Sequence, residues 1–270
     1  ILAQSHIGLK SRNVNDEQID SQFADSIGYV AGFLIYFILL IYGSQVMMGV
    51  MEEKTNRIAE VLVSSVRPFQ MMLGKIVGVG AVALTQFGIW IAFIFLAYNF
   101  GKENGTSMGG MAETVGYVQK IFTSVNMPII ISFFVFYFLG GFFFYASLYG
   151  AIGSAVNEDM REAQSLSFPI TMLVIISFVM MTAASTNPTG PIAVWGSIIP
   201  FSSPIVMMVR IPYGIPGTVP YWQLALSMSM LIIGFIVTVW FAGKIYRTGI
   251  LMYGKKITWK EMIKWGFKKN

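Results

Sequence analysis

The residues able to carry chemistry are concentrated in one short charged segment that follows a long apolar stretch. They are Glu52, Glu53, Lys54, Thr55, Asn56, Arg57 and Glu60. Gly49 stands before Lys54 and Thr55 much as in a phosphate-binding loop, but the second glycine of that motif is missing. The motif also needs a strand before it, whereas this segment follows an apolar stretch that predicts a helix. We therefore expect no nucleotide site here.

The rest of the composition excludes most other catalytic sites. The chain has no cysteine, and its single histidine is His6. Thiolate catalysis, disulfides and clusters of cysteine or histidine around a metal are thus excluded. No Asp, Glu or His lies within the predicted spans described next, although ion-coupled carriers usually need such groups near the membrane centre. We expect no enzymatic activity, cofactor or metal in this chain. If the protein moves a substrate uphill, we expect the energy to come from outside its membrane core.

Long charge-free stretches predict the elements that position this segment. Of the 270 residues, 55% are hydrophobic and 11% are charged, against about 25% charged in a typical soluble protein. A membrane helix needs about 20 apolar residues, and each of the long charge-free stretches can hold one. The predicted fold class is all-α integral membrane. Five spans are expected, at about 27–51, 69–98, 127–156, 163–184 and 220–243.

The apolar stretch 192–209 is predicted to dip into the membrane without crossing it. Pro200 and Pro204 interrupt it, and basic residues decide the topology. With five spans, 13 of the 18 Lys and Arg residues lie on one side, and a sixth span would reverse this balance. The positive-inside rule then places the N-terminus of this segment outside and the C-terminus in the cytoplasm. The expected location is a bacterial-type cytoplasmic (inner) membrane. The stretch 192–209 becomes a re-entrant hairpin of short helices in the outer leaflet.

The organisation of the chain follows from these spans. Residues 1–26 read as the end of an extracytoplasmic segment, 27–250 as the transmembrane domain, and 251–270 as a basic cytoplasmic tail. A polar external segment that starts at Ile1 without a signal peptide predicts an earlier span and an external domain before it. The full chain would then have six spans.

Segment 52–65 is predicted to form an amphipathic cytoplasmic helix. Ile58, Val61, Leu62 and Ser65 share one face, and Glu53, Asn56, Arg57, Glu60 and Ser64 the other. One interpretation is a plain interfacial helix lying on the membrane. Basic residues usually dominate such helices, whereas this one carries three acids and two bases up to Ser65. A soluble protein with a matching groove is therefore the better partner.

Small residues that recur every four positions predict close contacts between helices. They are Gly28 and Gly32, then Ala146, Gly150 and Ser154, and also Gly74 and Gly78. Aromatic residues gather at 133–138 and 142–145. Packing explains these two clusters, with stacking against a substrate as the alternative.

At this point the sequence resembles a family. The run Glu52–Ser65 with Pro68–Phe69 and Leu73–Ile76 resembles ABC-2 class ABC transporter permeases, in particular the sodium-extrusion and multidrug-type branch. Asn157–Gln164 is similar to the second cytoplasmic loop of that family. Ile199–Pro204, with Arg210, is similar to its outer re-entrant helices. The resemblance covers most of residues 27–250.

The resemblance implies a coupling helix that docks into a separate ABC ATPase, which would hold ATP and Mg. The implied contact residues are Glu52, Glu53, Lys54, Thr55, Asn56, Arg57 and Glu60 in the first loop, and Asn157, Glu158, Asp159, Arg161 and Glu162 in the second. A second permease copy would complete the route, in a homodimer or, alternatively, a heterodimer. No nucleic acid is expected as a partner.

The expected function is the permease subunit of an ATP-driven exporter. One alternative is a membrane subunit that passes ATPase motion to an external machine without moving a substrate. A second is an ion-coupled carrier or channel, which the shortage of charges in the spans disfavours. The apolar, aromatic and Met-rich spans suit a lipid-like or amphipathic substrate, and sodium remains open.

Overall fold

Helices form the regular structure throughout the part of the chain that the structure describes. The computed structural model describes residues 14–63, 65–103, 126–157, 159–254 and 257–267. The long helices are α1 (Val14–Thr55), α3 (Pro68–Glu103), α5 (Met127–Ala155), α6 (Met160–Thr186) and α9 (Tyr221–Gly249). The short ones are α2 (Ile58–Val63), α7 (Pro191–Ile198), α8 (Ser203–Arg210), the 3-10 helix η1 (Ile211–Tyr213) and α10 (Trp259–Phe267).

The five long helices are apolar and long enough to cross a membrane, which confirms the predicted all-α membrane class. Most of them extend beyond the predicted spans: α1 ends at Thr55 instead of 51, and α9 at Gly249 instead of 243. Hydropathy marks the part of a helix that lies in lipid. The backbone hydrogen bonds of a helix can continue into the polar interface, so the helix itself is longer.

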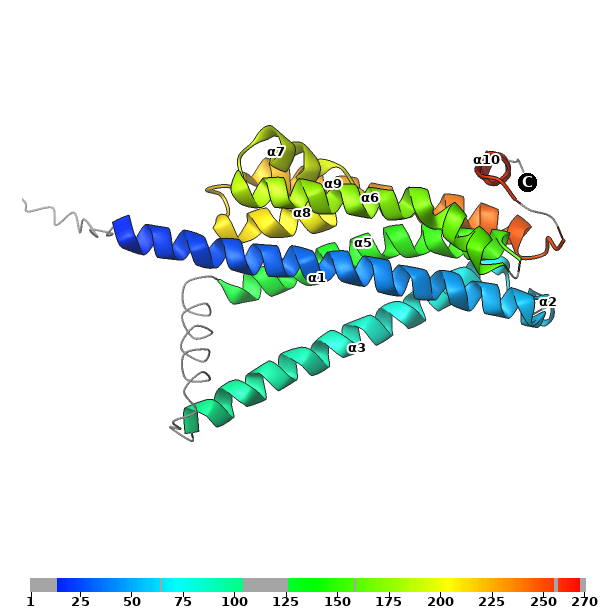
Figure 1. Ribbon diagram of the computed structural model, residues 1–270, viewed down its shortest axis with the longest axis horizontal. Helices are drawn as coiled ribbons and strands as arrows, with labels where there is room; N and C mark the ends of the chain where they lie inside the picture. Colours follow the sequence, from blue (N-terminus) through cyan, green and yellow to red (C-terminus); the bar gives the residue numbers. More distant parts are fainter. Residues whose placement is uncertain (1–13, 64, 104–125, 158, 255–256, 268–270) are drawn as a thin grey trace, which may run out of the picture.

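Helix α5 lies at the centre of the bundle, packed against α1 on one side and α9 on the other (Figure 1). Two buried tyrosines tie α5 to its surroundings. The Tyr137 hydroxyl donates a hydrogen bond to Ser227 Oγ of α9 at 2.9 Å. The Tyr145 hydroxyl donates to the carbonyl oxygen of Phe201, between α7 and α8, at 2.8 Å. Buried hydroxyls need such partners, so these bonds help to fix the position of α5.

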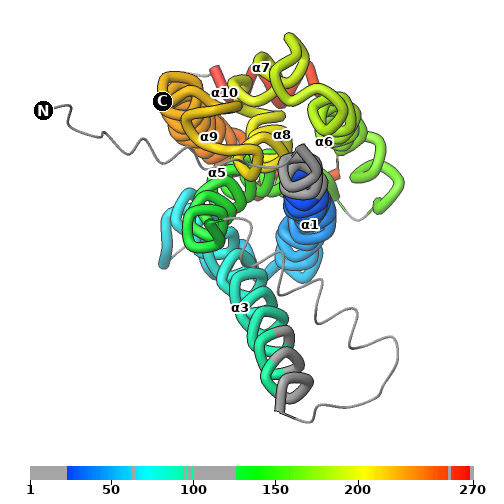
Figure 2. Tube along the Cα trace, turned by 90° about the vertical axis from the view of Figure 1, so that its left-hand side faces the viewer, coloured from blue at the N-terminus to red at the C-terminus, as the bar shows by residue number. Residues whose placement is uncertain are grey.

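Helix α3 packs on the bundle at its start and then diverges from it (Figures 1 and 2). The contact with α5 is aromatic: Phe87 lies 5.3 Å from Phe134 and 5.6 Å from Phe138, measured between ring centroids. Phe138 and Phe142 are fully buried. Part of the aromatic cluster predicted around 133–138 and 142–145 therefore packs helices together.

The stretch 192–209 forms two short helices, α7 and α8, as predicted. Proline occupies the first turn of each, where its missing N–H group costs no intrahelical hydrogen bond. Every residue of α8 is buried, and α8 packs against α1, α5, α6 and α7. This broken helical segment is thus surrounded by protein, the setting in which such backbone is tolerated at membrane depth.

A buried arginine holds this hairpin in place. Arg210 is 1% exposed, and its Nε donates to the carbonyl oxygen of Pro188 at 2.7 Å. Its two terminal nitrogens donate to Ser197 Oγ at 2.5 Å and to Gln223 Oε1 at 2.8 Å. The guanidinium group therefore joins the α6–α7 turn, α7, α8 and the start of α9 through neutral acceptors.

The C-terminal segment contains an element that the sequence prediction missed. Residues 251–270 were predicted as a basic tail, but α10 forms there and packs against α9. Met262 and Gly266, four residues apart, are its buried residues. Only these few positions pack α10 against α9. The many lysines around them led to the prediction of a basic tail.

Candidate partner-docking surface at one end of the bundle

The predicted coupling helix 52–65 is split into two parts by a turn. Residues 52–55 belong to the end of α1, and α2 begins only at Ile58. Between them Arg57 adopts a positive φ of 57°, and its N–H donates to the carbonyl oxygen of Lys54 at 3.0 Å. A non-glycine residue in this left-handed region costs about 1–3 kcal/mol and is often found at functional sites. The prediction of one continuous helix was wrong because α1 ends here and the chain changes direction.

Lys54 lies inside the protein and not on the surface offered to a partner. Its side chain is 1% exposed. The ammonium donates to the carbonyl oxygens of Ser154 at 2.7 Å and of Gly249 at 2.9 Å, with Ala155 at 3.4 Å. These are the ends of α5 and α9, whose last carbonyls lack partners within their own helices. Lys54 therefore joins the end of α1 to the ends of α5 and α9. This corrects its prediction as a residue that contacts the ATPase.

Glu53 also has a partner within the chain. Its carboxylate pairs with the ammonium of Lys75 in α3 at 2.7 Å, and both side chains are half-buried. The polar residues at the end of α1 therefore divide by role. Glu53 and Lys54 join α1 to neighbouring helices, whereas Glu52 and Thr55 are exposed.

The turn and α2 present an uncovered surface of mixed character. Asn56, Arg57 and Glu60 are exposed. Beside them Val61 is 72% exposed and Ile58 46%, while Ala59 is fully buried and fixes the helix to the bundle. We call the exposed residues Thr55, Asn56, Arg57, Ile58, Glu60, Val61 and Leu62 the turn surface. Apolar side chains ringed by charges are typical of protein interaction sites.

The second predicted loop lies at the same end of the bundle. Asp159 is exposed and caps α6 by accepting from the N–H of Arg161 at 2.8 Å, as N-cap residues do. Arg161 is exposed, and Asn157 is half-buried. Glu162 accepts a hydrogen bond from the N–H of Ile257 at 3.1 Å, so it supports the C-terminal segment. Glu158 lies outside the described residues.

The two predicted loops meet through Lys54. Its acceptors Ser154 and Ala155 are the residues that lead into the second loop, and the turn surface starts directly after it. In Figure 1 the ends of α1 and α5 lie together at the end of the bundle that carries α2. The structure thus brings most of the predicted contact residues that it describes to one end, as one packed unit with the membrane helices.

Tyr253 is a residue of this unit that the sequence analysis missed. Its hydroxyl donates to the carbonyl oxygen of Lys54 at 3.3 Å, and its ring lies 5.6 Å from the Lys54 ammonium. Partial burial raises the pKa of Tyr253, and the negative charge of Glu60 adds to this effect. A tyrosine just beyond the last span has no sequence motif that would indicate such a role.

The small residues predicted for helix packing lie at tight contacts within the chain, to differing degrees. A Cβ atom on Gly28 would lie 2.6 Å from the carbonyl oxygen of Val209, and one on Gly32 2.8 Å from Met181 Sδ. Ala146 and Ser154 are fully buried. Gly150 is looser, since its Cβ would lie 3.5 Å from Val46. Gly74 and Gly78 make no such contact within the described part of this chain, because a Cβ there would meet no atom within 4 Å.

A second polar contact joins the N-terminal part of α1 to the C-terminal end of α6. The Tyr213 hydroxyl donates to Asp25 Oδ1 at 3.0 Å, and the Ser185 hydroxyl donates to the same oxygen. Asp25 is the last charged residue before the first predicted span. The contact therefore fixes the start of the α1 span to η1, which follows the α7–α8 hairpin.

Comparison with known proteins agrees with this architecture. The family described as "ABC-2 family transporter protein" matches residues 2–244. The protein named "Uncharacterized protein YhaP" of Bacillus subtilis (strain 168) is 30% identical over 245 residues, covering 89% of this chain and 55% of the relative. "Uncharacterized protein MJ1024" of Methanocaldococcus jannaschii is 29% identical over 243 residues, covering 90% and 54%.

This chain thus spans about half the length of the curated relatives it matches. No solved structure gives a significant match. The match to the family extends over nearly the whole chain, from before α1 to within α9. The chain therefore belongs to the ABC-2 family of transporter proteins.

Proposed function

We propose that this chain is the permease subunit of an ATP-driven exporter, and that a separate ABC ATPase docks on the turn surface. Membrane proteins of the ABC-2 family are permease subunits, and the family implies an ABC ATPase partner. The chain then contributes the membrane route, while ATP and Mg bind to the partner. Two copies of the chain form the route, most simply as a homodimer.

One observation carries this proposal: the exposed turn surface is joined directly to the buried Lys54. A protein that binds Arg57 and Val61 pushes on the end of α1. Because the Lys54 ammonium binds the carbonyl oxygens that end α5 and α9, that push reaches three membrane helices at once. The positive φ of Arg57 is held by the hydrogen bonds of the turn, such as Arg57 N–H to the carbonyl oxygen of Lys54 and Glu60 N–H to that of Arg57. This arrangement suits a site through which the motion of a docked ATPase is passed to the membrane helices.

The chemistry of the turn surface favours a protein as its partner. Val61 and Ile58 offer apolar contact area, and Arg57 offers a planar, permanently charged group that can pair with a carboxylate at two points. Truncating one member of a buried interfacial charge pair costs about 2–5 kcal/mol. The loss of Arg57 should therefore weaken docking far more than it weakens the fold.

The test compares two substitutions at Arg57 in the complete complex. Arg57→Ala removes the charge and keeps the strained backbone, whereas Arg57→Gly removes the charge and relieves the strain. If the guanidinium group binds the ATPase, both variants lose ATPase co-purification and ATP-dependent export, and the glycine variant is the more stable of the two. A glycine variant that docks and transports normally would show that only the turn geometry matters.

A second pair of variants examines the apolar part of the surface. Val61→Asp places a carboxylate where the proposal needs an apolar contact, and Val61→Thr keeps the branching at Cβ and one methyl group without adding a charge. Since Val61 is 72% exposed, neither change should disturb folding. Docking should fail with Asp and survive with Thr. Equal docking by both variants would remove Val61 from the interface.

The competing proposal is a subunit that passes ATPase motion to an external machine. It includes the same docking step, so the Arg57 and Val61 variants cannot distinguish it from export. ATP-dependent movement of a compound across sealed vesicles separates the two. We propose export of a lipid-like or amphipathic compound, since the membrane helices expose large apolar and aromatic side chains, such as Trp90 and Phe93. Transport that survives collapse of the ion gradients would exclude an ion-coupled carrier.

A further inference from the structure

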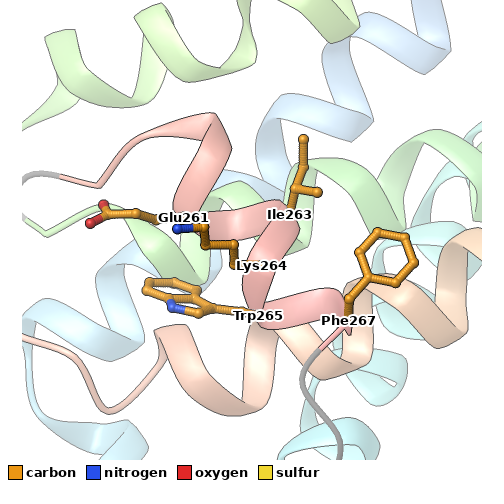
Figure 3. A pocket seen from close by; sticks show the side chains of 5 residues that line it. All are labelled: Glu261, Ile263, Lys264, Trp265 and Phe267. Atoms are coloured by element: carbon orange, nitrogen blue, oxygen red, sulfur yellow. The ribbon is translucent and has the colours of Figure 1, made fainter.

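Helix α10 presents an apolar edge and a basic edge to its surroundings, and the proposed docking does not use either of them. Ile263 is 45% exposed and Phe267 74%. Lys260 and Lys264 are exposed beside them. Residues four apart share a helix face, so the two apolar residues form one edge and the two lysines the next. Figure 3 shows Ile263 and Phe267 pointing away from the side that carries Glu261.

The contact with α9 fixes the position of α10 along the membrane helices. Gly266 lies against the ring of Phe241, so closely that a Cβ atom there would overlap it. The rings of Phe241 and Phe267 lie 5.6 Å apart, measured between centroids. The glycine permits this approach because it has no side chain. Helix α10 therefore lies at the level of Phe241 in α9.

That level has the character of a membrane interface. Trp240 is next to Phe241, and the ammonium of Lys244 lies 4.0 Å from the centroid of the Trp240 ring. Tryptophan is enriched where the hydrocarbon core meets the headgroups, and lysines near helix ends extend toward the headgroups. Before Trp240, α9 exposes Ile233, Ile236 and Val237, as expected of a surface facing lipid. The last turn of α10, which contains Gly266 and Phe267, thus lies where the lipid-facing part of α9 ends.

We propose that α10 is an interfacial helix that binds anionic phospholipid in the leaflet on the side of the turn surface. Ile263 and Phe267 enter the boundary of the acyl chains, in continuity with the exposed face of α9. Lys260 and Lys264 bind the phosphate-bearing headgroups. Helices with one apolar and one basic face bind anionic membranes in this way. The inference depends on the membrane position of α9 and not on the docking of an ATPase.

The absence of cysteine from the sequence makes a direct test possible. Single cysteines are placed at Ile263, Phe267 and, as a control expected in water, Arg57, and each is labelled with an environment-sensitive fluorophore. The full-length variants are reconstituted in vesicles of phosphatidylcholine with or without phosphatidylglycerol. Quenching by lipids with a spin label near the headgroup is compared with quenching by iodide in the water.

The proposal predicts strong lipid quenching and weak iodide quenching at 263 and 267, with the reverse at 57. Spin-labelled phosphatidylglycerol should quench position 267 better than spin-labelled phosphatidylcholine. Lys260→Gln and Lys264→Gln should each lower that preference about fivefold, the equivalent of about 1 kcal/mol per lysine near an anionic surface. Because both lysines are exposed, folding should be unchanged.

Two outcomes would overturn the proposal. Iodide quenching at 263 and 267 that equals the quenching at 57 would place this edge of α10 in water. Lipid quenching without any preference for phosphatidylglycerol, or with a preference that survives the removal of both lysines, would show that the headgroup is not recognised. A folded control is available in each case, because the elution profile in detergent reports the integrity of the variant.

Discussion

The ammonium of Lys54 donates a hydrogen bond to the carbonyl oxygen of Gly249 at 2.9 Å, although 195 positions separate the two residues in the sequence. The contact joins the end of the first described membrane helix to the end of the last. Ser154 at the end of α5 shares the same ammonium. The turn surface is therefore continuous with the central helices of the bundle.

Replacing Lys54 should separate docking from transport. Lys54→Met keeps the length and apolar stem of the side chain but removes the ammonium that donates to Ser154 and Gly249. The Gly249 oxygen keeps the N–H of Met252 as a donor at 3.1 Å, so the carbonyl oxygen of Ser154 is the acceptor that loses most. Leaving a buried acceptor unsatisfied costs about 1–3 kcal/mol, so thermal unfolding in detergent should occur at lower temperature. The turn surface remains, so ATPase co-purification should persist while ATP-dependent export falls.

Lys54→Arg provides the control for this prediction, since it keeps the charge but alters the geometry. It should retain more stability than Lys54→Met. If Lys54→Met unfolds and transports like the unmodified chain, the three helix ends are held together by other contacts and the proposed path of force is wrong.

The same glycine-to-alanine change should have opposite effects at two predicted packing positions. At Gly28 the new Cβ would lie 2.6 Å from the carbonyl oxygen of Val209, so the helices must separate at a cost of about 1–3 kcal/mol. At Gly150 the nearest atom would be 3.5 Å away, an ordinary contact, and alanine favours the helix by about 1 kcal/mol. Thermal unfolding of the two variants should move in opposite directions. If both variants shift the unfolding temperature in the same direction, the packing described around Gly28 or around Gly150 is wrong.

Arg210 should not be replaceable by lysine. Its guanidinium group reaches Pro188, Ser197 and Gln223 in three directions, and the compact ammonium of lysine cannot match that fork. Arg210→Lys should therefore lower the yield of folded protein, and limited proteolysis between residues 185 and 220 should become faster. Unchanged proteolysis would show that the α7–α8 hairpin is held by apolar packing alone.

The distribution of basic residues predicts the orientation of the chain. A tag after Asn270 should be protected in intact cells, and a tag inserted within 103–115 should be accessible from outside, because 13 of the 18 Lys and Arg residues lie on the tail side. Protease digestion of intact and opened cells measures this. An accessible C-terminal tag would invert the topology and place the turn surface outside, where no ATPase could reach it.

Composition and charge predict much of the fold, because a helix in lipid must satisfy its own backbone and remain apolar. The five spans and the pair of short helices at 192–209 follow from that rule and from the positions of Pro200 and Pro204. Residues that carry a charge proved harder to place. Glu53, Lys54 and Arg57 stand within five residues of the sequence, yet Lys54 is buried, Glu53 pairs with Lys75 and Arg57 is exposed.

The difference between these residues depends on tertiary contacts that no local pattern contains. Lys54 is buried because the ends of α5 and α9, whose last carbonyl groups have no partner within their own helices, meet beside it. The docking of α10 likewise depends on Gly266 finding the ring of Phe241. Sequence reasoning can identify which segment is charged, whereas the partner of each charge comes from the fold.

The most direct test of the account is site-specific photocrosslinking from the turn surface in membranes that contain the complete transporter. A photoreactive amino acid at Val61, which is 72% exposed, is compared with one at Val82 in α3, which is 60% exposed and lies within a membrane span. The account predicts an adduct with the ATPase subunit from position 61 and none from position 82. No ATPase adduct from position 61, or equal adducts from both positions, would contradict docking at the turn surface.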